Sequence, residues 1–336
     1  MIVITYNGKH HLDVCLSSVR RQTETDFETI LVDNASADGT VEYVRRTFPW
    51  VRIVANSSNL GFAEGNNVAA KTAMGDILVF LNDDTEVEPD WLEKILRPFE
   101  EDPAIGIVGC KAVDFYHRDT EIRVLCDIFG YAINDAVPRT PPERACRDVF
   151  YVPGFAMAIR AQLFRSLDGF DASYFMFAED VDLAWRALLA GWRMVRVLDG
   201  TVYHKFGGSI PGIQIVVDGP RRFRTTVWKR RLGERNLLTT LLKNYRTWTL
   251  AWLLPCYALG LAAEVAFFAL RGRRDVVTAY GQAVLANART LRDIRRKRNL
   301  VQRTRRIPDR RILSQMCFGS VKLIQGIRSG FQLEIE

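Results

Sequence analysis

Three polar residues end a short apolar segment near the middle of the N-terminal half, and their types point to metal chemistry. The apolar residues 78–81 are followed at once by Asn82, Asp83 and Asp84. Two neighbouring carboxylates repel each other unless a cation lies beside them, and oxygen ligands favour hard ions such as Mg²⁺ or Mn²⁺. Asn and Asp are also common in ordinary turns, so a solvated turn is the alternative reading of this segment alone.

A second group of acidic residues follows an aromatic run later in the chain. Glu179, Asp180 and Asp182 come directly after the Tyr-Phe-Met-Phe run at 174–177 and open a segment with helical spacing. Carboxylates at the start of a helix can simply cap its free N–H groups and interact favourably with its dipole. Capping a helix needs fewer than three acidic residues, so capping alone does not explain this group. A carboxylate beside apolar side chains is suited to act as a general base.

The first 110 residues have a pattern that brings such residues to one edge of a sheet. Predicted strands at 2–5, 27–32, 51–55 and 78–81 alternate with amphipathic segments, as in the βα units of a parallel sheet. Ligands of open α/β sheets bind outside the carboxyl ends of the strands, although each polar residue taken singly is also ordinary loop chemistry. The residues predicted to surround this crevice are Thr5, Tyr6, Asn7, Asp33, Asn34, Ser36, Asn59, Gly61, Asn66, Asn82, Asp83 and Asp84.

The middle of the chain is harder to assign. Segment 114–148 contains three prolines and is predicted as an irregular loop over the site. No Gly-x-Gly-x-x-Gly follows the first strand, which disfavours a nicotinamide dinucleotide-binding protein. The remaining predicted elements are a helix at 91–99, a strand at 105–110, a β-ribbon at 149–160 broken at Pro153-Gly154, a helix ending near 189, and a strand at 194–198 that leads to His204.

Composition narrows the class of protein. The chain has 336 residues, 48% of them hydrophobic, which allows one large α/β domain with an appendage and argues against disorder. Six scattered cysteines without a Cys-x-x-Cys pair indicate neither a zinc site nor a disulfide framework and fit a reducing cytosol. The strand-like first residues predict no cleavable signal.

The net charge of +7 is uneven, because eleven basic and two acidic residues between Arg289 and Arg311 give that tract a charge of +9.

The C-terminal part has a different character. Residues 248–270 carry one charge, Glu264, and approach the length that spans a bilayer. A single crossing would put the basic tract on the side opposite the catalytic domain, against the positive-inside tendency. We therefore predict an interfacial or re-entrant helical hairpin that contacts an anionic membrane surface through 245–311, with no nucleic-acid partner. A helical subdomain packed on the catalytic core is the alternative.

Together these motifs resemble the inverting family 2 glycosyltransferases of the GT-A fold, and within them the rhamnosyltransferase-like branch. The resemblance implies an α/β, Rossmann-like, mostly parallel sheet flanked by helices. The catalytic domain would span 1–220, with a donor half at 1–110 and an acceptor half at 111–220, and 221–336 would form a helical, basic, membrane-associating region. The matching segments are Ile4-Thr5-Tyr6-Asn7, residues 32–39, residues 59–63 with Asn66, residues 81–84, Gly169-Phe170-Asp171, residues 179–183, and His204.

The resemblance also implies roles for single residues. Asp180 would deprotonate the acceptor hydroxyl, and Asp84 with His204 would hold a divalent metal, Mn²⁺ or Mg²⁺, on the donor diphosphate. Asn82 stands where the family's signature begins with Asp, which weakens the expected affinity for the ion. Asp33 would bind the nucleobase of the donor and Asp83 its ribose. Thr5, Asn7, Ser36 and Asn66 would complete the donor pocket, and Glu179, Trp185 and Arg186 would line the acceptor side.

The implied activity is that of an inverting hexosyltransferase. It would move a sugar from a nucleotide-diphosphate donor, with dTDP-L-rhamnose as the first candidate, to a lipid-linked or polysaccharide acceptor at the cytoplasmic face of the cell membrane, in cell-envelope glycan synthesis. One alternative is a sugar nucleotidyltransferase, which would need a longer phosphate loop than Asn7-Gly8-Lys9. Another alternative is a glycan-binding protein of the same fold without catalysis.

Overall fold

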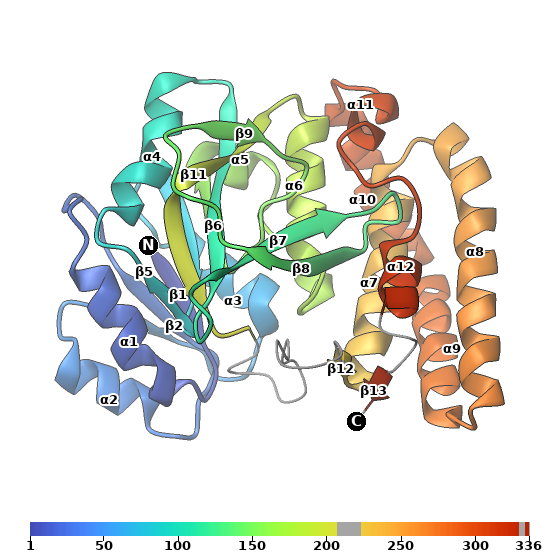
Figure 1. Ribbon diagram of the computed structural model, residues 1–336, viewed down its shortest axis with the longest axis horizontal. Coiled ribbons are helices and arrows are strands. Elements are labelled where there is room, and N and C mark those ends of the chain that lie inside the picture. The colour runs from blue at the N-terminus through green and yellow to red at the C-terminus, as the bar shows by residue number, and fades with distance from the viewer. Residues whose placement is uncertain (207–222, 329–332, 336) are drawn as a thin grey trace. The chain divides into compact units, whose positions relative to one another are not determined.

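The computed structural model describes residues 1–206, 223–328 and 333–335 (Figure 1). These residues divide into two compact units. The first contains Met1–Val124, Asn134–Ala187 and 192–206, and the second contains Leu125–Ile133, Leu188–Gly191 and the described residues from 223 onward. The sequence-predicted domain boundary between residues 220 and 221 lies outside the described residues.

The N-terminal part of the first unit is a parallel sheet with helical crossovers, as the sequence predicted. Strand β1 pairs in parallel with both β2 and β4, and β2 pairs in parallel with β3. Helix α1 buries Leu12, Cys15, Leu16 and Val19, whose i, i+3, i+4, i+7 spacing is that of one face of a helix. The elements are β1 (Ile2–Thr5), α1 (Lys9–Arg20), β2 (Ile30–Asp33), α2 (Thr40–Thr47), β3 (Arg52–Ala55), α3 (Gly61–Ala70) and β4 (Ile77–Asn82).

The remainder of the first unit continues the sheet as a mixed one, which differs from the mostly parallel sheet that was expected. Strand β10 runs antiparallel to both β4 and β6, whereas β11 is parallel to β6 and antiparallel to β5. The order along the sheet is β3-β2-β1-β4-β10-β6-β11-β5. The elements are β5 (Thr85–Val87), α4 (Trp91–Glu101), β6 (Ile105–Asp114), β7 (Thr120–Cys126), β8 (Ala132–Pro138), β9 (Cys146–Asp148), β10 (Ala156–Arg160), α5 (Ala161–Ser166), a 3₁₀ turn (Ala172–Tyr174), α6 (Glu179–Leu189) and β11 (Arg193–His204).

Three sequence-based expectations about elements are wrong. Segment 114–148 is not an irregular loop, because β7 pairs with β6 and β8, and β9 pairs with β11. The β-ribbon expected at 149–160 is a single strand, β10. The sequence also predicts a helix at 68–74, but helix α3 spans Gly61–Ala70 and begins seven residues earlier. Within it, buried Asn67 both donates to and accepts from the backbone of Phe170. Long-range bonds of this kind override weak helix propensity.

The second unit is mainly helical. Helix α7 packs on α9 and α10, and α8 packs on α9 (Figure 1). Phe268, Val276 and Tyr280 form a buried apolar cluster between α8 and α9. The elements are β12 (Phe223–Thr225), α7 (Val227–Asn244), α8 (Thr247–Leu270), α9 (Arg274–Arg289), α10 (Leu291–Thr304), α11 (Asp309–Leu313), α12 (Val321–Arg328) and β13 (Leu333–Ile335).

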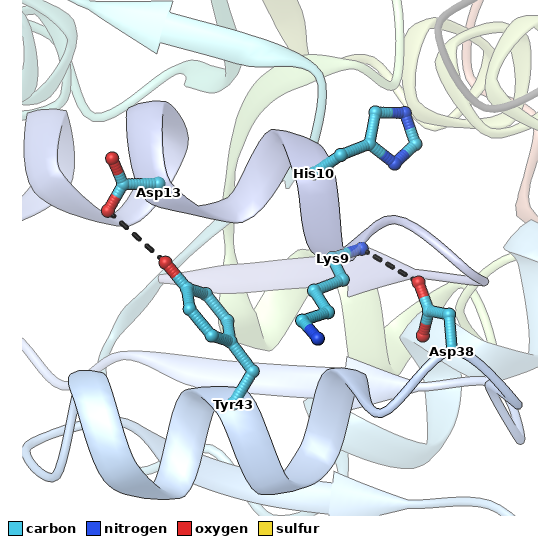
Figure 2. Close-up of a pocket in the computed structure, with 5 residues that line it drawn as sticks. All are labelled: Lys9, His10, Asp13, Asp38 and Tyr43. Atoms are coloured by element: carbon cyan, nitrogen blue, oxygen red, sulfur yellow. Dashed lines mark hydrogen bonds between the residues drawn. The ribbon is translucent and has the colours of Figure 1, made fainter.

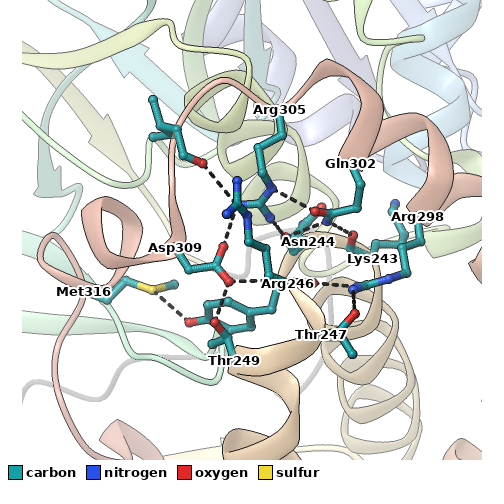
Figure 3. A network of polar contacts seen from close by, with 12 residues as sticks. Lys243, Asn244, Arg246, Thr247, Thr249, Arg298, Gln302, Arg305, Asp309 and Met316 are labelled. Carbon is teal, nitrogen blue, oxygen red and sulfur yellow. Dashed lines mark hydrogen bonds and ion pairs between the residues drawn. The ribbon is translucent and has the colours of Figure 1, made fainter.

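Part of the basic tract stabilises this unit from within. Arg298 donates to the carbonyls of Leu242 and Tyr245 at 2.6 and 2.5 Å, at the C-terminal end of α7. Arg305 donates to the Asn244 carbonyl and pairs with Asp309 at 2.5 Å (Figure 3). Carbonyls at a helix C-terminus lack intrahelical partners, and arginine side chains satisfy them here. These two arginines are therefore structural. The sequence alone had suggested that the whole tract faces an anionic lipid surface, and for Arg298 and Arg305 this prediction is wrong.

Candidate active site

The carboxyl ends of the first strands bring the predicted donor residues together. In the sheet register Thr5 lies opposite Asp33, Ile4 lies opposite Asn82, and Asp33 lies opposite Ala55. The polar residues after β1, β2 and β4 therefore start from one row across the sheet, as the sequence predicted. This row is the edge at which ligands of α/β sheets bind.

Asp83 is held in place by Thr5, and Gly8, which sequence reasoning did not select, leaves room for its side chain. The Thr5 hydroxyl donates to Asp83 Oδ2 at 2.6 Å, and both side chains are buried. A Cβ atom on Gly8 would lie only 1.9 Å from the same oxygen and 2.4 Å from Thr5 Oγ1. Gly8 thus leaves the space that the Asp83 carboxylate occupies, and any side chain there would displace it.

Asp33 has an unused acceptor atom in a buried position. Its Oδ2 accepts from the Ser36 backbone at 3.1 Å, while Oδ1 is buried and has no hydrogen-bond partner among the residues that the structure describes. A buried acceptor left without a partner costs free energy, which a ligand donor would recover. Asn7 and Ser36 join the two neighbouring loops, because the Asn7 N–H donates to Ser36 Oγ and Asn7 Oδ1 accepts from the Ala37 N–H, both at 2.8 Å.

The turn before α3 is shaped by amide side chains. Asn59 Oδ1 accepts from the Gly61 N–H at 2.9 Å, and Asn34 donates to the Gly61 carbonyl at 3.0 Å. Gly61 has a positive φ of 75°, and a Cβ there would lie 2.4 Å from the Phe175 carbonyl oxygen. Asn66 donates to the Phe62 carbonyl, and its buried Oδ1 lacks a partner within the described chain. Asn34 and Asn59 therefore build the loop, and Asn66 offers a second buried acceptor.

The two other donor-side candidates differ in exposure. Tyr6 is 44% exposed, so its ring lies on the surface of the unit. Asn82 is the last residue of β4, and its backbone N–H donates to the Phe155 carbonyl at 3.0 Å. Its side-chain oxygen is buried and makes no hydrogen bond within residues 1–206 or the other described segments.

Asp84 and His204 lie side by side although 120 residues separate them. Strand β11 pairs with β5 so that His204 lies opposite Thr85, and His204 Nε2 is 3.0 Å from Asp84 Oδ1. The imidazole packs against both Phe155 and Phe206, with ring centroids at 4.4 and 4.2 Å, and these two rings also contact each other. Both polar side chains are buried. The structure thus joins the two residues that the resemblance assigned to a metal.

The donor set fits a divalent ion that takes its other ligands from substrate. In the described chain no group of three or more His, Cys, Asp and Glu side chains forms a ligand cluster. A carboxylate and an imidazole are two suitable ligands, and Mg²⁺-type ions are commonly held by one or two carboxylates together with substrate phosphates and water. Asp84 and His204 are therefore compatible with an ion that binds with the donor, but not with a closed structural metal site.

Asp180 is a carboxylate held in place by hydrogen bonds from another segment of the first unit. One oxygen, Oδ2, accepts from the Tyr151 hydroxyl at 2.6 Å and from the Gly154 N–H at 2.9 Å. Burial raises the pKa of Asp180 above its usual value, although these hydrogen bonds act in the opposite direction. Burial and the neighbouring charges of Asp180 and Asp182 also raise the pKa of Glu179, well above its usual value. A carboxylate with a raised pKa is a stronger base at neutral pH.

The backbone before Asp180 is strained. Phe175, Phe177 and Ala178 have positive φ angles of 62°, 71° and 64°. Such conformations cost a non-glycine residue about 1–3 kcal/mol each and tend to occur where a functional site requires them. The aromatic run that sequence analysis noted therefore forms a tight turn that delivers Asp180 to its position.

Two residues predicted on the acceptor side lie inside the fold instead. Trp185 is fully buried and packs edge-on against Phe150, with ring centroids 5.4 Å apart. Arg186 is buried, pairs with Asp182 at 2.7 Å, and donates to two backbone carbonyls near Gly169. Their helix turns these side chains toward the core, so neither is available to an acceptor. The expectation for both is not supported.

Sequence reasoning also missed residues that complete the site. Tyr151 lay in a segment predicted as a ribbon, and its position two residues before Pro153-Gly154 was the available signal.

A separate hollow of about 490 Å³ lies between α1 and α2 and is lined by Lys9, His10, Asp13, Asp38 and Tyr43 (Figure 2). None of these five residues was predicted to bind the donor.

Comparison with known proteins agrees with this geometry. The family model described as glycosyl transferase family 2 matches residues 1–166. An uncharacterised glycosyltransferase of Haemophilus influenzae is 30% identical over 189 residues, which cover 56% of this chain and 61% of that protein, less than two thirds of its length. The N-acetylglucosaminyl-diphospho-decaprenol L-rhamnosyltransferase of Mycobacterium tuberculosis is 28% identical over 229 residues, covering 61% of this chain and 75% of the relative.

Solved structures show the same fold at low identity. GalNAc-T7 with UDP, GalNAc and Mn²⁺ gives a TM-score of 0.58 at 16% identity, covering 74% of this chain and 48% of that chain. The mannosyltransferase PcManGT of Pyrobaculum calidifontis, in complex with GDP-Man and Mn²⁺, gives a TM-score of 0.51 at 19% identity, covering 90% of this chain and 84% of that chain. Residues 1–166 therefore carry a glycosyl transferase family 2 domain, within a GT-A-like mixed α/β sheet.

Proposed function

We propose that this protein is a glycosyltransferase that moves a sugar from a nucleotide-diphosphate donor to a hydroxyl acceptor with inversion of configuration. The observation that carries the proposal is Asp180, a carboxylate of raised pKa whose Oδ2 is fixed by Tyr151 and Gly154. It belongs to the same compact unit as the buried Asp84 and His204. One unit thus contains both a base and a pair of ligands suited to a diphosphate-bound ion.

The donor would lie along the strand-end row. The buried, unpartnered Oδ1 of Asp33 is suited to accept an N–H of the nucleobase, and Asp83, oriented by Thr5, is suited to accept from the ribose. Asn66 Oδ1 offers a further acceptor in the donor pocket. Asn7 and Ser36 support this pocket by joining its two loops.

Mn²⁺ or Mg²⁺ held by Asp84 and His204 would neutralise negative charge on the leaving diphosphate when bound. Asp180 accepts the acceptor's hydroxyl proton. The acceptor oxygen forms a bond to the anomeric carbon as the bond from that carbon to the diphosphate oxygen breaks. Attack from the face opposite the leaving group inverts the configuration at this carbon.

The sugar and acceptor are proposed from the relatives. The name of the M. tuberculosis relative specifies rhamnose and a lipid-linked N-acetylglucosaminyl diphosphate, so dTDP-L-rhamnose and a polyprenyl-diphosphate-linked sugar are the first substrates to test. A lipid-linked acceptor would place the enzyme at the cytoplasmic face of the cell membrane, as a peripheral or monotopic protein in cell-envelope glycan synthesis. Helix α8, of 24 residues with an 18-residue window of mean hydropathy 1.9, is the segment that would make the contact.

The test compares donor binding with transfer. Asp180→Asn keeps the shape of the side chain but cannot take the proton, so it should bind nucleotide sugar with Mn²⁺ like the wild type and lose transfer to a synthetic polyprenyl-diphosphate N-acetylglucosamine. NMR of the wild-type product should show the anomeric configuration opposite to that of the donor. Retained configuration, or near wild-type turnover by Asp180→Asn, would contradict the mechanism.

A further inference from the structure

Helix α8 presents an apolar face to solvent along its whole length. It contains 24 residues, so it is about 36 Å long. Only 11% of its most apolar window is buried within the protein. Trp248 is 86% and Leu259 is 73% exposed, and Trp252, Cys256, Ala263 and Leu270 are exposed on the same side. A core helix of a soluble protein would be mostly buried, and α8 is not.

The opposite face of α8 holds its single charge against the protein. Glu264 accepts from Arg230 of α7 and from the Tyr280 hydroxyl of α9, both at 2.8 Å, and it also pairs with Lys322 of α12. Leu253 and Phe268 are buried on this side. The helix is therefore divided into an inner face with a satisfied carboxylate and an outer face without any charged group.

Arginines mark both ends of this outer face. Arg246 immediately precedes α8 and is exposed, and Arg271 and Arg274 follow it and are exposed as well. The two indoles, Trp248 and Trp252, lie near one end of the helix. Arginine and tryptophan are the residues that favour the head-group level of a bilayer.

This arrangement identifies lipid, and not another protein, as the partner of the outer face. Protein interfaces contain roughly one hydrogen bond per 100–200 Å² and a polar rim. Apart from Thr247 at its first position, the exposed residues of α8 are Trp, Ala, Pro, Cys, Leu and Gly, so beyond that hydroxyl the face offers only the Trp indole N–H groups and the weakly donating Cys256 thiol. A surface of this kind with cationic ends matches a hydrocarbon layer bordered by anionic head groups.

The ion pairs of Glu264 favour an orientation of α8 parallel to the membrane over a crossing of it. A crossing of the bilayer by α8 would carry Arg230, Lys322 and the neighbouring Glu234, which pairs with Lys322 at 3.1 Å, into the hydrocarbon. Charged groups at that depth are very costly. With the helix parallel to the membrane, this network stays on the protein side and the arginines at both ends reach head groups together.

We propose that α8 is an in-plane membrane helix, whose outer face inserts into one leaflet of an anionic phospholipid bilayer while Glu264 remains bound to α7, α9 and α12. The inference deepens the proposed function, on which it rests for the need to reach a lipid-linked acceptor. It also specifies the contact, since α8 and its two ends bind the bilayer while Arg298 and Arg305 serve the fold.

The native cysteines provide the first test. Cys256 is exposed on the outer face of α8, and Cys146 is exposed in the first unit and serves as the matched control. Full-length protein carrying Cys146→Ser or Cys256→Ser is labelled with an environment-sensitive fluorophore and mixed with phosphatidylglycerol–phosphatidylethanolamine vesicles. We expect a blue shift and quenching by acyl-chain nitroxide lipids for the label on Cys256 and no change for the label on Cys146. A Cys256 label that stays in water would overturn the proposal, as would its burial in a soluble dimer that does not bind vesicles.

A second measurement distinguishes a helix that lies in the plane of the membrane from one that crosses it. Arg246→Cys and Arg271→Cys, made one at a time in a Cys256→Ser, Cys146→Ser background, place a thiol at the head-group level at either end of α8. An in-plane helix leaves both thiols reactive toward an impermeant reagent added outside the vesicles, whereas a crossing helix protects one of them. Leu259→Arg should weaken vesicle binding about tenfold or more, because an inserted apolar side chain is replaced by a charge.

Leu300→Arg, at an exposed leucine of α10, is the control that should leave vesicle binding unchanged. In detergent, Leu259→Arg should release nucleoside diphosphate from the donor like the wild type, because it lies outside the first unit. Loss of vesicle binding with donor chemistry intact supports the in-plane helix. Absent donor chemistry in the wild type would contradict the proposed function alone, since the vesicle measurements do not depend on it.

Discussion

Gly8 offers a stringent test of the donor site. In Gly8→Ala the new Cβ would start 1.9 Å from Asp83 Oδ2 and 2.4 Å from Thr5 Oγ1, so the buried carboxylate must move. The 2.6 Å bond between Thr5 and Asp83 is then lost. A hydrogen bond to a charged group contributes about 1.5–3 kcal/mol. Since each 1.4 kcal/mol is a factor of about ten in affinity, we expect the donor to bind about 10- to 100-fold more weakly.

The assay is isothermal titration of the preferred nucleotide sugar in the presence of Mn²⁺. Gly281→Ala is the matched control, because no atom lies within 4 Å of a Cβ built at that position of α9 and alanine favours helix. Thermal unfolding should show that both variants are folded. A folded Gly8→Ala protein that binds donor like the wild type would refute the placement of Asp83 in the donor site.

Two further substitutions test the base and the helical unit. Tyr151→Phe removes a hydrogen bond that favours ionised Asp180, so the pKa of Asp180, already raised by burial, rises further and the acidic limb of kcat moves to higher pH with donor affinity unchanged. An unmoved limb would remove Tyr151 from the site. Arg305→Ala removes the charged partner of buried Asp309 and should lower the free energy of unfolding in urea by about 3–5 kcal/mol. The exposed Arg303→Ala should lower it by less than about 0.5 kcal/mol, and equal losses would contradict the capping role.

Much of the donor half follows from the sequence because its signals are local. Apolar runs that end in Thr5, Asp33 and Asn82 are strands, and the parallel pairing of those strands brings the three residues into one row. The same logic does not bring His204 to Asp84. That contact depends on the pairing of β11 with β5, which no local pattern specifies.

The errors have a common physical origin in tertiary contacts. Asn67 keeps α3 helical through bonds to Phe170, a partner 103 residues away, whereas its own propensity favours a loop. Trp185 and Arg186 follow the acidic motif directly, but the rotation of α6 turns them toward Phe150 and the Gly169 carbonyl. Sequence spacing placed them near the site, and only packing shows which way they point.

The most direct test of the account is release of nucleoside diphosphate by the full chain from a panel of nucleotide sugars, with Mn²⁺ or with EDTA. We predict release from one donor, with dTDP-L-rhamnose tested first, that requires the metal and is abolished by Asp84→Ala. Release from that donor that is equal in EDTA, or unchanged in Asp84→Ala, would contradict the assignment of Asp84 and His204. No release and no thermal stabilisation with any nucleotide sugar would contradict the donor site as a whole.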